Sequence, residues 1–127
     1  MCNFSERGGV TLFENILAEL LRLDGVKGAA VVGKDGLVID FETTDKTIDP
    51  DIAAAMVAAV YGSGTTVMDR IMDGKTDIVM VEGDKGKILL IDAGENAVLT
   101  VFTESKVNLG LIRIEMKRVA ERIAASL

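Results

Sequence analysis

The longest regular pattern of apolar and polar positions lies between Asp49 and Asp73 and is that of a helix. Asp49 is a favourable N-cap residue, Pro50 suits the first helical position because its missing N–H needs no partner there, and Gly74 is a plausible stop. The large apolar side chains cover about twice the roughly 100° stripe that a helix packed on one side needs. We therefore expect this helix to pack against more than one surface, and the second can belong to another copy of the chain.

Three arcs of this helix have different characters. The first arc carries Ile52, Met56, Val60, Val67 and Ile71, and the arc beside it carries Val57, Tyr61, Met68 and Met72. The third arc begins with small residues and then turns polar, through Ala55, Ala58, Gly62, Thr65, Thr66, Asp69 and Asp73. A helix face of small side chains permits another backbone to approach closely, and we expect the third arc to do so.

Shorter patterns precede this helix. Residues 11–14 (Thr-Leu-Phe-Glu) have capping-box spacing and begin a first helix, which we expect to end at Asp24-Gly25. Two short apolar runs follow, at residues 28–32 and 37–41. Asp35-Gly36 between them predicts a β-hairpin with a type I′ turn, which needs positive φ at both central residues.

Three strands and a last helix are expected after residue 74. Apolar runs at residues 77–82, 87–92 and 97–103 predict an antiparallel meander, and because two of them are apolar on both faces we expect the sheet to be covered on both sides. The last helix begins near Asn108 and places Leu109, Ile112, Met116, Val119 and Ile123 on one stripe. The order α-β-β-α-β-β-β-α predicts an α+β domain, with a five-stranded antiparallel sheet between two helical layers. We expect residues 1–9 to be a loose arm and residues 10–127 a single domain.

Composition narrows the possible partners. The formal charge of −6 disfavours nucleic acid and anionic lipid, and aromatic residues make up only 4% of the chain, too few for base stacking. No run approaches the roughly 20 apolar residues of a membrane span, and the N-terminal segment lacks a signal-peptide core. Cys2 is the only cysteine, which excludes an internal disulfide and favours a cytoplasmic location.

The sequence offers no set of catalytic residues. The chain has no histidine, and the one cysteine lies in the expected arm. Asp49 and Asp51 could suggest a metal site, but their position at the start of a helix explains both at least as well. The run Gly62-Ser63-Gly64-Thr65-Thr66 lacks the lysine and spacing of a phosphate-binding loop and lies inside a helix, so backbone packing explains its glycines better. We therefore expect no enzymatic activity, no cofactor and no metal.

Three phrases of the sequence resemble a known family. Residues 23–32 (LDGVKGAAVV), 35–38 (DGLV) and 108–113 (NLGLIR) are similar to the Roadblock family, which includes dynein light chains and bacterial and archaeal regulators of small GTPases. The resemblance covers roughly residues 10–125 and departs from the family pattern at Asp24, where a proline is common. A single-domain chain of this kind most resembles the prokaryotic, GTPase-regulating branch.

The resemblance implies a homodimer in which the second helix and the third strand pair with their twofold mates. It also implies a protein without enzymatic activity that binds a small Ras-like GTPase and modulates its nucleotide cycle. A structural adaptor in a larger complex is the alternative, and a small-molecule sensor is a third possibility. The residues that we expect at the dimer or partner interface are Ala55, Ala58, Ala59, Gly62, Ser63, Thr66, Arg70, Ile78, Val79, Met80 and Val81.

Arginine positions bear on how such a regulator would act. An arginine finger needs a protruding loop that faces the partner. The arginines other than Arg7 fall on predicted helices, and Arg7 lies in the expected arm. Arg70 is the best remaining candidate, although pairing with Asp73 or with the helix dipole would also explain it.

Overall fold

The computed structural model describes residues 13–127, in which three helices surround one five-stranded sheet. The helices are α1 (Glu14–Leu21), α2 (Pro50–Met72) and α3 (Leu109–Ser126), and the strands are β1 (Val26–Gly33), β2 (Val38–Thr43), β3 (Val79–Gly83), β4 (Gly86–Asp92) and β5 (Ala97–Thr103). All neighbouring strands are antiparallel, in the spatial order β2-β1-β5-β4-β3. The predicted α+β class and element order are confirmed. The expected arm and Thr11 of the capping box lie outside the described residues.

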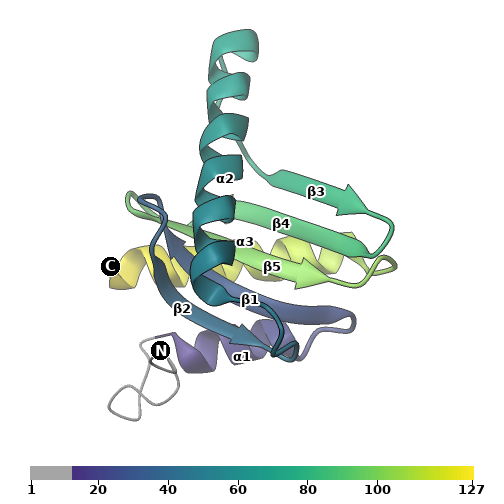
Figure 1. Cartoon of the computed structure of the whole chain (residues 1–127). Helices are drawn as coiled ribbons and strands as arrows, with labels where there is room; N and C mark the ends of the chain where they lie inside the picture. Colours follow the sequence, from purple (N-terminus) through teal and green to yellow (C-terminus); the bar gives the residue numbers. More distant parts are fainter. Residues whose placement is uncertain (1–12) are drawn as a thin grey trace.

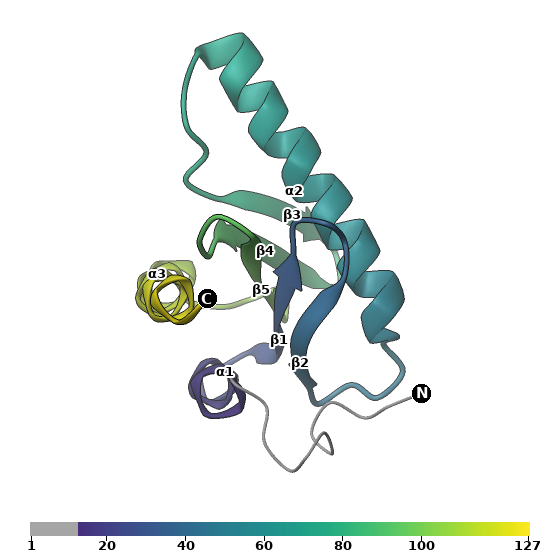
Figure 2. The same cartoon turned by 90° about the vertical axis from the view of Figure 1, so that its left-hand side faces the viewer.

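The two faces of the sheet are covered by different helices (Figure 2). Leu89 and Ile91 of β4 point into a core with α1 and α3, whereas Leu90 between them packs with α2. The stripe predicted for α3 is confirmed, because Ile112, Met116, Val119 and Ile123 are all buried. Alternation along the strands thus builds two cores, and among the described helices only α2 covers its face.

Both ends of α2 follow from local chemistry. The Asp49 side chain accepts hydrogen bonds from the backbone N–H groups of Asp51 at 2.9 Å and Ile52 at 3.4 Å, which confirms it as the N-cap. At the other end Asp73, rather than the expected Gly74, adopts the left-handed conformation, with φ of 50°. Aspartate tolerates this region better than most residues, so Asp73 can serve as the C-cap and the helix ends at Met72.

The β1–β2 turn differs from the expected type I′ geometry. Gly36 has a φ of 92°, but Asp35 is not among the described non-glycine residues with positive φ. The N–H of Gly36 donates to the carbonyl of Gly33 at 2.9 Å, and the N–H of Gly33 donates to the carbonyl of Leu37 at 2.8 Å. This is a three-residue loop in which only the glycine needs positive φ, a common alternative to the two-residue turn.

The remaining helix ends are shifted or confirmed. α1 ends at Leu21, before the expected Asp24-Gly25, and a short turn leads to Gly25, whose φ is 85°. Asn108 caps α3, since its side chain accepts a hydrogen bond from the N–H of Leu111 at 3.1 Å.

Asp77, just before β3, contacts Lys117 at 3.1 Å and Arg113 at 3.0 Å, and these two cations lower the pKa of its carboxyl group. The linker between α2 and β3 is thereby fixed to α3.

Candidate functional site

The most exposed apolar surface of the described chain lies along α2. This helix of 23 residues is roughly 34 Å long and extends past the β3 edge of the sheet (Figure 1). Its buried residues, Ala53, Ala54, Val57 and Tyr61, all belong to the half that crosses the sheet. Large apolar residues that remain exposed on α2 are Ile52, Met56, Val60, Val67, Met68, Ile71 and Met72. We call this set the apolar face of α2.

The β3 strand adds a free edge next to this face. β3 is the last strand of the sheet and pairs only with β4 among the described strands. Met80 and Val81 are exposed, and Val79 is half-buried. The expectation that both faces of the sheet are covered is incomplete at β3, since Met80 and Val81 stay exposed within the described chain. An exposed apolar edge strand presents unpaired backbone groups that can template pairing with another strand.

The predicted interface residues lie at or near this surface, except Ile78, which precedes β3 and packs against the core on the α1 and α3 side of the sheet. The third arc of α2, called the small-residue arc from here on, is exposed at Ala55, Gly62 and Thr66 and half-buried at Ala58. The predicted residues Ala59, Ser63 and Arg70 lie outside this arc on the same helix and are also exposed. The structure does not test their role. The larger apolar residues of the neighbouring arc were left out of the predicted interface, although the width of the apolar pattern was the signal that could have included them.

The two glycines of the run at residues 62–66 have different surroundings. A Cβ atom added to Gly64 would lie 2.9 Å from Cγ2 of Val79, so Gly64 lets β3 approach the helix. A Cβ atom added to Gly62 would meet no described atom within 4 Å. Packing inside the described chain therefore explains Gly64 and does not explain Gly62.

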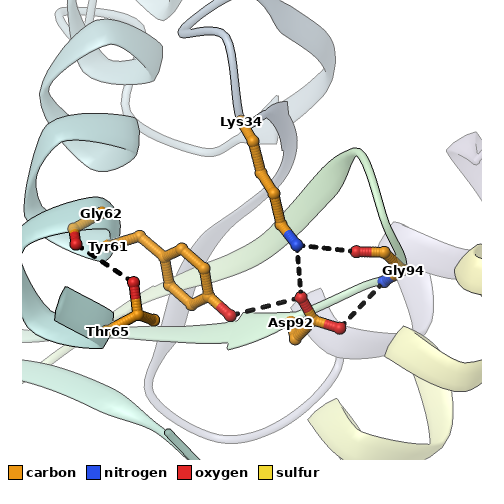
Figure 3. A network of polar contacts seen from close by, with 6 residues as sticks. All are labelled: Lys34, Tyr61, Gly62, Thr65, Asp92 and Gly94. Carbon is orange, nitrogen blue, oxygen red and sulfur yellow. Dashed lines mark hydrogen bonds and ion pairs between the residues drawn. The ribbon is translucent and has the colours of Figure 1, made fainter. Parts of the chain in front are cut away.

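A polar network joins α2 to the end of the sheet where the β1–β2 and β4–β5 turns lie (Figure 3). The ammonium group of Lys34 donates to Oδ1 of Asp92 at 2.7 Å and to the carbonyl of Gly94 at 2.9 Å. The hydroxyl of Tyr61 on α2 donates to the same Asp92 oxygen at 3.3 Å, and the Lys34 ammonium lies 5.9 Å from the centre of the Tyr61 ring. Burial, and then the charge of Asp92, raises the pKa of Tyr61 to about 12. The network ties α2 to the β1–β2 and β4–β5 turns.

A cavity of about 260 Å³ lies between this network and the small-residue arc. Its lining residues are Lys34, Ala58, Tyr61, Gly62 and Thr65. Sequence analysis missed the network, since Lys34, Tyr61 and Asp92 are far apart in the chain and form no motif. Only the fold brings them together.

Two general features limit the chemistry of the surface. Within residues 13–127, no group of three His, Cys, Asp or Glu side chains could hold a metal ion. By length and composition alone, α2 could cross a membrane, in contrast to the expectation that no run approaches that length. Length and composition are weak evidence for a membrane span, since a helix in a protein core can meet the same criterion, and the first half of α2 packs on the sheet.

Several known proteins are similar to this chain in sequence or in fold. The Roadblock/LC7 domain family model matches residues 12–103. Uncharacterized protein MJ1340 of Methanocaldococcus jannaschii is 45% identical over 114 residues, covering 90% of this chain and 98% of that protein. A Roadblock/LC7 domain structure from Streptomyces avermitilis superposes with a TM-score of 0.82 at 23% identity, covering 89% of this chain and 95% of the other. Myxococcus xanthus MglB superposes with a TM-score of 0.79 at 24% identity, covering 91% and 99%.

The structural likenesses show a shared fold, and the sequence matches show kinship. The family model spans most of the chain and includes the first two phrases on which the resemblance rests. Since the Methanocaldococcus relative also aligns over nearly its full length, the chain belongs to the Roadblock/LC7 domain family.

Proposed function

We propose that this protein is a homodimeric regulator that binds a small Ras-like GTPase and modulates its nucleotide cycle. The observation that carries the proposal is the apolar face of α2 beside the free edge of β3, on a chain of the Roadblock/LC7 family. Regulators of small GTPases occur in that family, as the resemblance noted above implies. The protein acts by binding, without an enzymatic reaction of its own.

The exposed surface supports the proposed dimer. An apolar patch of seven large side chains next to the free edge of a strand is typical of an interaction site. Pairing of two β3 edges would join two five-stranded sheets and satisfy the backbone groups that alternate residues of β3 point away from β4. The same assembly would remove the apolar side chains of α2 from water, at about 25 cal/mol for each Å² buried. We therefore propose a dimer that is stable at micromolar concentration.

The GTPase contact is proposed for the small-residue arc of α2. The short side chains of Ala55, Ala58 and Gly62 leave the helix backbone accessible. The hydrogen bonds among Lys34, Asp92 and Tyr61 hold the helix against the sheet. A rigid helix with short side chains allows close approach of a partner. This arc is distinct from the apolar face, so a dimer and a bound GTPase are compatible on one helix.

The test begins with the assembly and continues with the partner. Light scattering should show a dimer, and a monomer at micromolar concentration would contradict the proposal. A Ras-like GTPase that copurifies with the protein, or is encoded beside it, should then show altered GTP hydrolysis or nucleotide exchange when the protein is added. Stable binding with unchanged rates would favour the structural adaptor instead. A cytoplasmic location stays a prediction.

A further inference from the structure

A second cavity adjoins the one that lies between the polar network and the small-residue arc. Its volume is about 360 Å³, and Tyr61 and Thr65 line both cavities. The second cavity also lies against Asp69 of α2 and against residues 74–76 of the segment that links α2 to β3. The two cavities together form one groove along the helix, which we call the α2 groove.

The α2 groove lies on the side of the helix that faces away from β3. Gly64 faces β3, because a Cβ atom added there would lie 2.9 Å from Cγ2 of Val79. Gly62 lines the groove, and a step of two residues turns a helix by about 200°, so the two glycines point to nearly opposite sides. Pairing through the β3 edge therefore leaves the α2 groove open.

Two groups in the α2 groove lack a partner in the described chain. Glycine destabilises a helix interior relative to alanine, yet no described atom lies within 4 Å of a Cβ atom added to Gly62. Glycine suits such a position when the backbone of another molecule approaches it closely. The hydroxyl oxygen of Thr76, which lines the second cavity, is buried and has no hydrogen-bond partner among the described residues. The groove therefore has both the space and an unused polar atom for a ligand.

The charges of the α2 groove favour an uncharged ligand. Lys34 and Asp92 already neutralise each other at 2.7 Å (Figure 3). The other two charged lining residues, Asp69 and Lys75, have opposite signs. Three hydroxyl groups also line the groove, those of Tyr61, Thr65 and Thr76. Because a hydroxyl group both donates and accepts hydrogen bonds, these groups match the N–H and C=O groups of a peptide main chain.

We infer that the α2 groove receives an extended main-chain segment of the GTPase. This inference rests on the proposed function, since the small-residue arc forms one wall of the groove and a GTPase seated on that arc also reaches it. From Ala58 to Asp69 the helix rises by about 16 Å, the length of roughly five extended residues. The segment passes closely over Gly62, and its peptide groups bond to the hydroxyl groups of the groove, including that of Thr76.

Binding of the copurified GTPase to three variants tests this inference. Gly62→Leu fills the groove and should weaken binding by at least about tenfold, because the leucine occupies the space of the segment. Ala125→Leu, at an exposed position on α3, is the matched control and should bind as the wild type does. Thr76→Val removes one hydroxyl group and should weaken binding by roughly three- to tenfold, the loss of one hydrogen bond. Calorimetric titration measures binding, and circular dichroism and light scattering check the fold and the dimer.

The wild-type titration separates this inference from the proposed function. A wild type that does not bind the GTPase overturns both. Equal binding by the wild type and a folded Gly62→Leu variant overturns the inference and leaves the proposed function standing. A loss of binding in Gly62→Leu alone, with Thr76→Val binding as tightly as the wild type, confines the contact to the small-residue arc and also overturns the inference. Should Gly62→Leu fail to fold, Thr76→Val decides, because its hydroxyl group has no partner in the described chain whose loss would weaken the fold.

Discussion

The side chain of Tyr61 reports on how α2 packs against the sheet. It is the only tyrosine in a chain that has no tryptophan, so the absorbance of tyrosinate measures this residue alone. Its hydroxyl is bonded to Asp92 beneath α2, and its ring packs in the core. The ionisation of Tyr61 is therefore a direct measure of the packing between α2 and the sheet.

The first prediction concerns this ionisation. Because burial and Asp92 raise the pKa of Tyr61 from 10.0 to about 12, the folded protein holds the proton more tightly than the unfolded chain. Its contribution to stability is complete below about pH 10 and is lost as the pH rises through about 12. Absorbance titration should give a midpoint near 12 in the folded protein and near 10 in denaturant.

Asp92→Asn provides the control for this titration. It removes the carboxylate but leaves the burial, so the midpoint should fall and still remain above that of the unfolded chain. A midpoint near 10 in wild-type protein with intact circular dichroism would show that Tyr61 is not held as described.

The sequence predicts contacts between residues close together in the chain, but not contacts between distant residues. Asp49 and Asn108 were predicted as helix starts because a cap depends on residues within three positions of it. The pairing of Lys34 with Asp92 joins residues 58 positions apart, which no local pattern encodes. Pairing of Arg70 with Asp73 was a local expectation and is wrong, since within residues 13–127 Arg70 forms no ion pair.

Among the helices and strands, α2 was predicted best and its surroundings least. Its ends were predicted within one residue, and its double apolar character was read from the width of the pattern. The pattern could not say which arc meets the chain's own sheet, because that depends on where the sheet ends. The edge position of β3 likewise depends on strand order, which the run of apolar residues at 77–82 does not specify.

The glycines of α2 give the second prediction. Gly62→Ala should raise the free energy of unfolding by about 1 kcal/mol, because alanine favours the helix and the added Cβ meets no described atom within 4 Å. Gly64→Ala is the matched control and should be less stable than Gly62→Ala, since its Cβ would lie 2.9 Å from Val79. Denaturant unfolding followed by circular dichroism measures both. Equal effects at the two positions would contradict the packing described for Gly64.

For the assembled protein, the third prediction separates folding from partner binding. Ala58→Glu should leave the secondary structure intact, because Ala58 is only half-buried and lines an open cavity, in which the new carboxylate can stay in contact with water. Binding of the GTPase should weaken by at least about tenfold, since a partner packed on the small-residue arc would have to desolvate this charge. Calorimetric titration with the copurified GTPase measures the change.

The matched control for Ala58→Glu lies on the other side of the sheet. Ala125 is exposed near the end of α3, and Ala125→Glu adds the same charge away from the small-residue arc. We expect Ala125→Glu to bind the GTPase as the wild type does. Unaltered binding in both variants would show that the arc is ordinary surface.

The last prediction concerns how a regulator of this shape would accelerate GTP hydrolysis. We expect it to position the residues of the GTPase rather than insert an arginine, because an arginine finger must be free and face the partner. Arg113, Arg118 and Arg122 are engaged with Asp77, Glu115 and Glu19 on the α1 and α3 side of the sheet. Arg22 caps the end of α1 on that same side, away from α2. Arg7 lies outside the described residues, and Arg70 is exposed near the end of α2.

Arg70 and Arg7 are therefore replaced by alanine separately, with Arg118→Ala as the matched control. A finger contributes roughly a thousandfold or more to the rate of hydrolysis, whereas a residue that only helps to seat the partner contributes much less. If α2 acts as a rigid support, stimulated hydrolysis should fall only a few-fold in either variant, in step with any loss of binding. A thousandfold loss with binding intact would instead identify that arginine as the finger and exclude the positioning mechanism.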